Sequence, residues 1–89
     1  MKLTLMLNSN ANTIEEKVGV VISFVGKMTP LLLIWRRKRI VIKKVNLFLK
    51  KKIGKNVLYY FFVSDADGNG YKLCFNLSKM EWILDEVTF

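Results

Sequence analysis

From residue 17 onward this chain is a succession of short apolar runs separated by turn residues, with no sustained helical period, a pattern typical of β-strands. The alternation of apolar and polar residues is clearest over residues 71–77, where every second residue is Tyr, Leu or Phe. One face of such a strand is buried and the other is solvated, as in many antiparallel sheets. Turn-forming residues divide the apolar runs, which predict strands at about residues 17–25, 31–36, 39–50, 56–64, 70–78 and 81–88.

The parity of the apolar positions changes at two points. Within residues 39–50 it changes across Lys43 and Lys44, and near the end of the chain it changes between Leu84 and Val87. A β-bulge resets which side chains face inward, so a bulge is expected at each point, and each bulge adds twist. The prediction is therefore an all-β fold: a small single domain built as a highly twisted, barrel-like antiparallel meander of five to six strands.

The length and composition of the chain indicate one domain. Its 89 residues, 52% of them hydrophobic, suffice for one core without a metal or a disulfide. Residues 8–13 are small and polar and are typical of a flexible linker. Residues 1–13 are therefore predicted to form a flexible or edge-strand tail, and residues 14–89 the β domain.

Residues 18–35 are largely apolar and precede four basic residues, an arrangement that a membrane-spanning helix also shows. Lys27 and Pro30 interrupt this segment, and a central lysine costs about 2.5–3.5 kcal/mol on insertion. Two strands joined by a turn fit the segment better. Because the apolar run after Lys2 is too short for a signal peptide and the single cysteine forms no internal disulfide, a cytoplasmic protein is expected.

Positive charge is concentrated in one stretch of the chain. Ten of the fifteen basic residues lie within residues 36–55, which contain no acidic residue, and the formal net charge is +8. A localised cationic surface attracts polyanions such as nucleic acid. The alternative is that the lysines only solvate an exposed strand and deter aggregation. The candidate phosphate-binding residues are Arg36, Arg37, Lys38, Arg39, Lys43 and Lys44.

Four consecutive aromatic residues, 59–62, place rings on both faces of one strand. Alternation assigns Tyr59, Phe61 and Val63 to the core, which leaves Tyr60 and Phe62 on the opposite face. Exposed rings beside lysines stack on bases in proteins that bind single strands. The alternative is that the N-terminal segment or a second subunit covers them.

Residues suited to catalysis or metal binding are scarce. The chain has no histidine and one cysteine, Cys74, which is interpreted as an ordinary strand residue, so no enzyme activity, cofactor or metal is expected. Residues 65–70 match the first half of a calcium-binding EF-hand loop, but Asn76 stands where the final glutamate ligand belongs. A hairpin turn capped by its own side chains is the preferred interpretation.

The order of residues over 35–82 resembles a family of short bacterial β-meander proteins with the pattern Trp-x-Gly-Arg-x-Tyr-x-Val-x-x-Val. The matching positions are Trp35, Ile40, Ile42 and Val45, the aromatic strand 59–63, Gly68 or Gly70, Tyr71-Lys72-Leu73 and Trp82-Ile83-Leu84. The chain departs from the pattern at Arg37, where the family has a turn glycine, and at Ile40, where it has tyrosine. Since the family has no established activity, the resemblance implies a fold and no function.

These observations lead to one preferred function and two alternatives. The preferred function is that of a non-enzymatic, small basic accessory domain that binds single-stranded nucleic acid or another polyanion through a cationic stripe. In that case Tyr60 and Phe62 are expected to stack on bases. The first alternative is an interaction or structural module whose aromatic sheet face docks a protein partner or a second copy of the chain. A membrane-anchored small protein is the third.

Overall fold

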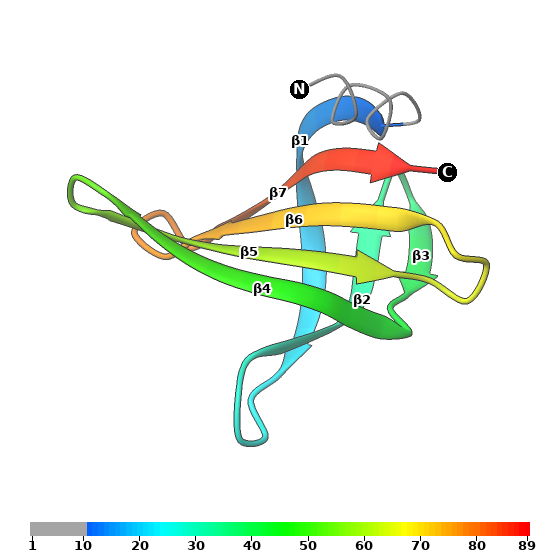
Figure 1. Ribbon diagram of the computed structural model, residues 1–89, viewed down its shortest axis with the longest axis horizontal. Helices are drawn as coiled ribbons and strands as arrows, with labels where there is room; N and C mark the ends of the chain where they lie inside the picture. Colours follow the sequence, from blue (N-terminus) through cyan, green and yellow to red (C-terminus); the bar gives the residue numbers. More distant parts are fainter. Residues whose placement is uncertain (1–10) are drawn as a thin grey trace.

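The computed structural model describes residues 11–89, and the regular structure in this range is all β-strand (Figure 1). The strands form one antiparallel sheet in the order β3-β2-β1-β7-β6-β5-β4. They are β1 (Ala11–Ser23), β2 (Thr29–Trp35), β3 (Lys38–Val41), β4 (Lys44–Ile53), β5 (Asn56–Ser64), β6 (Gly70–Asn76) and β7 (Glu81–Thr88). The predicted all-β single domain is confirmed, with seven strands rather than five or six.

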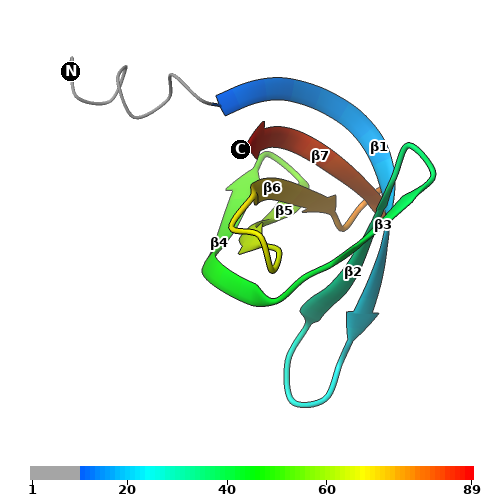
Figure 2. The same cartoon turned by 90° about the vertical axis from the view of Figure 1, so that its right-hand side faces the viewer.

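Strand β1 joins the two halves of the sheet. Residues 11–18 pair with β7, whereas residues 19–23 pair with β2, and the strand bends strongly between them (Figure 2). Residues 11–13, predicted to end a flexible or edge-strand tail, are strand residues that pair with β7 and have no partner in β2. The rest of the predicted tail, residues 1–10, lies outside the described residues.

The predicted strand over residues 39–50 is in fact two strands, because the backbone changes partners at residues 42–43. The Ile42 N–H donates to the Leu31 carbonyl at 3.0 Å, whereas the Lys43 N–H donates to the Ser64 carbonyl at 2.9 Å. The change of parity in the sequence therefore marks a corner, at which the chain passes from one end of the sheet to the other.

The two predicted bulges have different outcomes. In β7, Asp85 is an extra residue opposite β6, as expected, and this lets both Leu84 and Val87 face the core, where each is fully buried. In β4 the expected bulge at Lys43 and Lys44 is wrong, since the corner lies there. The register of β4 against β5 shifts instead between Val45 and Leu47.

The core lies on the concave face of the coiled sheet. Phe61, Leu73 and Leu84 are cross-strand neighbours on β5, β6 and β7, and Leu33 of β2 joins the same cluster. None of these four side chains is more than 1% exposed. Full burial of such a side chain contributes about 1.5–3 kcal/mol, and with no helix among the described residues the sheet buries this row only by curling over it.

The coiled sheet does not close into a barrel. β3 and β4 stand at the two ends of the strand order and are not paired with each other. The predicted curl of the sheet is therefore present, but the sheet is open and is not a barrel. As predicted, residues 18–35 form strands joined by a turn. Within the described residues, no helix has the length and apolar character needed to cross a membrane.

The turn between β2 and β3 is made by two arginines with left-handed backbones. Arg36 has φ 50° and Arg37 has φ 66°, the positive values that a tight two-residue hairpin turn requires. Glu16 of β1 stabilises this turn, since it accepts hydrogen bonds from Trp35 Nε1 at 3.0 Å and Arg36 Nε at 3.2 Å and forms an ion pair with the same guanidinium. Arg37 has no comparable contact among the described residues.

We predict that Arg37→Gly stabilises the protein. The substitution removes a left-handed backbone cost of about 1–2 kcal/mol, and the greater chain entropy of glycine offsets about 0.5–1 kcal/mol of that gain. The expected net gain in the free energy of unfolding is about 0.5–1 kcal/mol, measured by urea denaturation. Lys38→Gly, one residue further along in β3, is the matched control and is expected to destabilise the protein. A loss of stability in Arg37→Gly would contradict the prediction.

Candidate nucleic-acid interface

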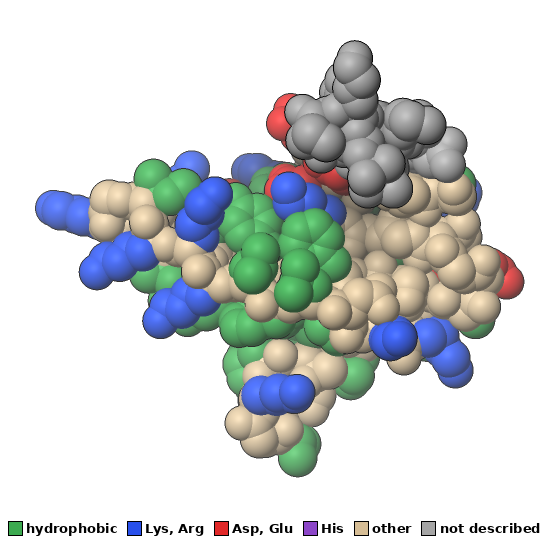
Figure 3. Space-filling view, viewed as in Figure 1, with side chains coloured by type: hydrophobic (Ala, Val, Ile, Leu, Met, Phe, Trp, Pro, Cys, Tyr) green, Lys and Arg blue, Asp and Glu red, His purple; other side chains and the backbone are tan. Residues whose placement is uncertain are grey.

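Two aromatic side chains lie side by side on the convex face of β5. Tyr60 and Phe62 point away from the core that holds Phe61 and Val63, as the alternation predicted. Both rings are half-buried, and the Lys72 ammonium lies 5.4 Å from the centroid of Tyr60 and 5.6 Å from that of Phe62. Figure 3 shows hydrophobic side chains gathered in the middle of this face with lysines around them. We call Tyr60, Phe62 and Lys72 the aromatic platform.

The aromatic platform borders a shallow hollow of about 240 Å³ on the side of β4. Leu49, Lys50 and Lys51 complete its lining. The hollow therefore combines flat apolar surface with the cations Lys51 and Lys72, whereas Lys50 borders it but stands opposite Tyr59 of the concave face. Lys72 was not among the residues predicted to bind nucleic acid. The alternation of residues 71–77 does place its side chain on the solvent-facing side of the strand.

The opposite side of the aromatic platform is less favourable to an anion. Asp85 and Glu86 of β7 lie next to β6 on this side, and Glu86 is the cross-strand partner of Lys72. Burial raises the pKa of Asp85, while the positive charge of Lys72 acts against that rise. A polyanion is consequently expected to run along the β4 side and away from β7.

Cys74 lies beside Tyr60 and behaves as a strand residue, as predicted. It is buried in β6 and pairs with Tyr60 and Ile83 in the sheet. Burial raises the pKa of the Cys74 thiol, and the negative charge of Asp85 raises it further. The pKa of Tyr60 is also raised, chiefly by burial. Both groups are therefore neutral near pH 7, and a protonated thiol is a poor nucleophile.

The predicted cationic residues of the β2–β3 turn are partly neutralised. Arg36 is ion-paired with Glu16 and lies 4.8 Å above the centroid of the Trp35 ring. Hydrogen bonding to Arg36 and then to Trp35 holds the pKa of Glu16 below its usual value, so this carboxylate stays charged. Arg39 borders a hollow that it shares with the acidic loop after β5, at Asp65 and Asp67.

The remaining predicted cations have no ion pair within the described part of the chain. Arg37 and Lys38 are exposed in and beside the β2–β3 turn, and Lys43 and Lys44 are exposed at the corner that leads into β4. In Figure 1 the β2–β3 turn lies behind the C-terminal end of β7, whereas β4 and β5 cross the front. The structure thus groups Tyr60 and Phe62 with Lys50, Lys51 and Lys72, and leaves the arginine turn apart from them.

The loop over residues 65–70 is a hairpin turn closed by its first residue, as the sequence predicted. Asp65 Oδ1 accepts hydrogen bonds from the main-chain N–H groups of Asp67 at 2.9 Å and Asn69 at 3.0 Å. Its Oδ2 accepts from Asn69 Nδ2 at 3.1 Å and from the Tyr71 hydroxyl at 2.8 Å. Burial acts to raise the pKa of Asp65, but these hydrogen bonds outweigh it and the pKa is lowered.

No protein-family model matches this chain, and comparisons with curated protein sequences and with solved structures likewise return no match. The resemblance to short bacterial β-meander proteins therefore stays a prediction.

We predict that Asp65→Asn destabilises the protein by about 1–3 kcal/mol at pH 7. The new amide nitrogen replaces Oδ2 and leaves Asn69 and Tyr71 without their acceptor. Because the pKa of Asp65 is lowered by folding, its contribution is present above the unfolded value of about 3.9 and is lost as pH falls through the folded value. Urea denaturation of both proteins should therefore show a difference that shrinks below pH 4; a constant difference would contradict this account.

We predict that calcium leaves the melting temperature unchanged. Both carboxylate oxygens of Asp65 already accept hydrogen bonds from the loop and from Tyr71. A bound cation would have to displace those donors. Thermal unfolding followed by circular dichroism, with calcium or with a chelator, tests this. A saturable stabilisation by calcium in the millimolar range would show that the loop is an ion site.

Proposed function

We propose that this protein is a non-enzymatic accessory domain that binds single-stranded nucleic acid on the convex face of β4, β5 and β6. The observation that carries the proposal is the aromatic platform, in which two adjacent rings lie on a solvent-facing sheet surface with Lys72 over them and Lys51 beside them. Flat rings stack on bases of any sequence, and the lysines attract the phosphates that connect those bases.

The energies of the competing contacts favour base stacking over the arrangement in the free protein. Lys72 lies over both rings, and a cation–π contact at such an exposed position contributes about 0.5–1 kcal/mol. A base stacked on an aromatic side chain contributes about 1–3 kcal/mol. A base can therefore displace the Lys72 ammonium from the ring faces. The long side chain of Lys72 then reaches a neighbouring phosphate.

The phosphate path follows the acid-free side of the aromatic platform. β4 contains four lysines and no carboxylate, and Lys43 extends the same cationic surface at the corner. Arg37 and Lys38 are more distant contacts that a longer strand would reach. Arg36 and Arg39 contribute less, because Glu16 neutralises the first and the acidic loop faces the second.

We predict that Tyr60→Ala and Phe62→Ala each weaken binding to a fluorescein-labelled oligothymidylate or oligouridylate of about 12 nucleotides by roughly tenfold. Stacking releases no counterions, so the slope of log affinity against log salt should not change. Reversing Lys43 and Lys44 together should instead flatten that slope by about one unit for each phosphate that is no longer neutralised. Fluorescence anisotropy across a salt series measures both quantities.

Matched controls separate this site from general stickiness. Phe89→Ala removes another exposed aromatic side chain and Lys79→Glu reverses a lysine in the β6–β7 turn, and neither is expected to change the affinity by more than about twofold. Far-ultraviolet circular dichroism confirms that each variant is folded. Absence of binding by the wild-type protein at about 50 mM salt, or equal losses at Phe62 and Phe89, would refute the proposal.

A further inference from the structure

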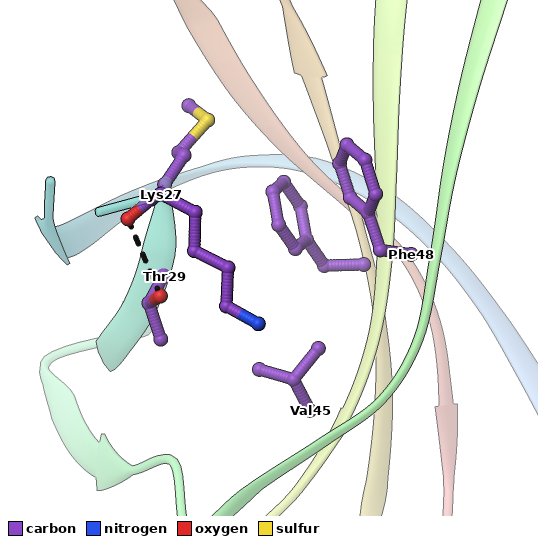
Figure 4. Close-up of a pocket in the computed structure, with 6 residues that line it drawn as sticks. Lys27, Thr29, Val45 and Phe48 are labelled. Carbon is purple, nitrogen blue, oxygen red and sulfur yellow. Dashed lines mark hydrogen bonds between the residues drawn. The ribbon is translucent and has the colours of Figure 1, made fainter. Parts of the chain in front are cut away.

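An apolar groove runs along the open side of the coiled sheet, on the face opposite the aromatic platform. It consists of two adjoining cavities of about 370 and 540 Å³, which share Met28 and Phe48 as walls. Figure 4 shows the first cavity between Lys27 and Thr29 on one side and Val45 and Phe48 on the other. The second continues toward the ring of Trp82.

The groove is incompletely covered by the described residues. Phe48 is 49% exposed, and Phe24 and Met80, which line the second cavity, are each 70% exposed. Continuous apolar surface of this kind on a small protein is typical of a binding site.

One wall of the groove is a free sheet edge. β4 stands last in the strand order and pairs only with β5, so among the described strands its other edge has no partner. In such a strand every second residue directs both its main-chain N–H and its C=O away from the paired strand. A strand of ten residues therefore has about five residues whose main-chain groups are free to pair. A strand that added to this edge would turn every second side chain, spaced by about 7 Å, toward the groove.

The charge around the groove selects the kind of strand that fits. β4 carries Lys44, Lys50, Lys51 and Lys52 without an acidic residue, and Lys27 extends from the β1–β2 loop into the first cavity (Figure 4). Two copies of this edge would bring lysines together, which disfavours self-pairing. Glutamate or aspartate side chains on an added strand would be attracted to the same lysines.

We propose that an extended acidic segment of another protein, with apolar side chains at alternate positions, adds as an eighth strand to the free edge of β4. Its main chain pairs with the outward amides and carbonyls of β4, and its apolar side chains fill the two cavities beside Phe48. Its carboxylates then face the opposite side of the sheet, where Lys44 and Lys51 of β4 lie. This mode combines main-chain hydrogen bonding for affinity with side-chain pockets for specificity, and it uses a site separate from the aromatic platform.

The test uses the whole chain and a capped synthetic peptide as long as β4 in which glutamate alternates with isoleucine or phenylalanine. Binding is measured from the fluorescence change of Trp82, which lines the groove, and located by slower hydrogen exchange of β4 amides. We expect a peptide with lysine in place of glutamate, and one with two prolines in place of isoleucine, to bind at least about tenfold more weakly.

Three protein variants make the result specific. Phe48→Ser is expected to weaken peptide binding about tenfold, whereas Leu47→Ser, at an adjacent and equally exposed position on the other face of β4, should leave it unchanged. Lys51→Glu, which leaves the apolar lining intact, should weaken binding of the acidic peptide and strengthen binding of the lysine peptide. The proposal is wrong if no acidic peptide binds at millimolar concentration, if the proline peptide binds equally, or if both serine variants have the same effect. A concentration-dependent dimer that Phe48→Ser disperses would assign the groove to a second copy instead.

Discussion

The fold depends on the burial of one row of side chains. Phe61, Leu73 and Leu84 stand next to one another across three strands, and Leu33 meets them from β2. No helix within the described residues covers this row, so the sheet itself has to bend over it. The bulge at Asp85, the bend in β1 and the corner at residues 42–43 are the devices that produce the curl. The open side of the sheet follows from the same requirement, because the row is fully buried before the edges meet.

This curl gives the two faces of β4 and β5 different properties. On the concave face the rings of Phe48 and Tyr59 extend the core beyond its buried part, into the groove. On the convex face Tyr60 and Phe62 share one lysine and stand beside others. One pair of strands thus presents apolar surface on both sides. Lysines on β4 keep that surface hydrated, and in both proposals they attract the negative charge of the partner.

The sequence predicts the features that depend on local alternation and misses those that depend on register. The strand class, the bulge at Asp85 and the outward orientation of Tyr60 and Phe62 all follow from a period of two. The corner at residues 42–43 has the sequence pattern of a bulge, because both events change the parity of apolar positions in the same way. Only pairing partners far along the chain distinguish them.

The candidate site shows the same division. The basic stretch was evident from composition, but the neutralisation of Arg36 depends on Glu16, twenty residues away, and no local pattern marks that pairing. Lys72 was missed because it lies outside the acid-free stretch, although the fold brings it over the aromatic rings. The groove was not predictable, since its walls come from the β1–β2 loop and from β4, segments that are far apart in the sequence and that only the fold brings together.

The arrangement of β1 also bears on how this chain folds. Strands β1 to β3 form one series of hairpins and β4 to β7 another, and each series is held by pairings between sequence neighbours. The β1–β7 ladder alone joins distant segments, since Ala11 meets Thr88 across almost the whole described chain. Closing so long a loop costs chain entropy before any contact compensates for it, so we expect this ladder to form late in folding. The strand that shapes the finished sheet is then also the one whose pairing the folding chain is expected to complete last.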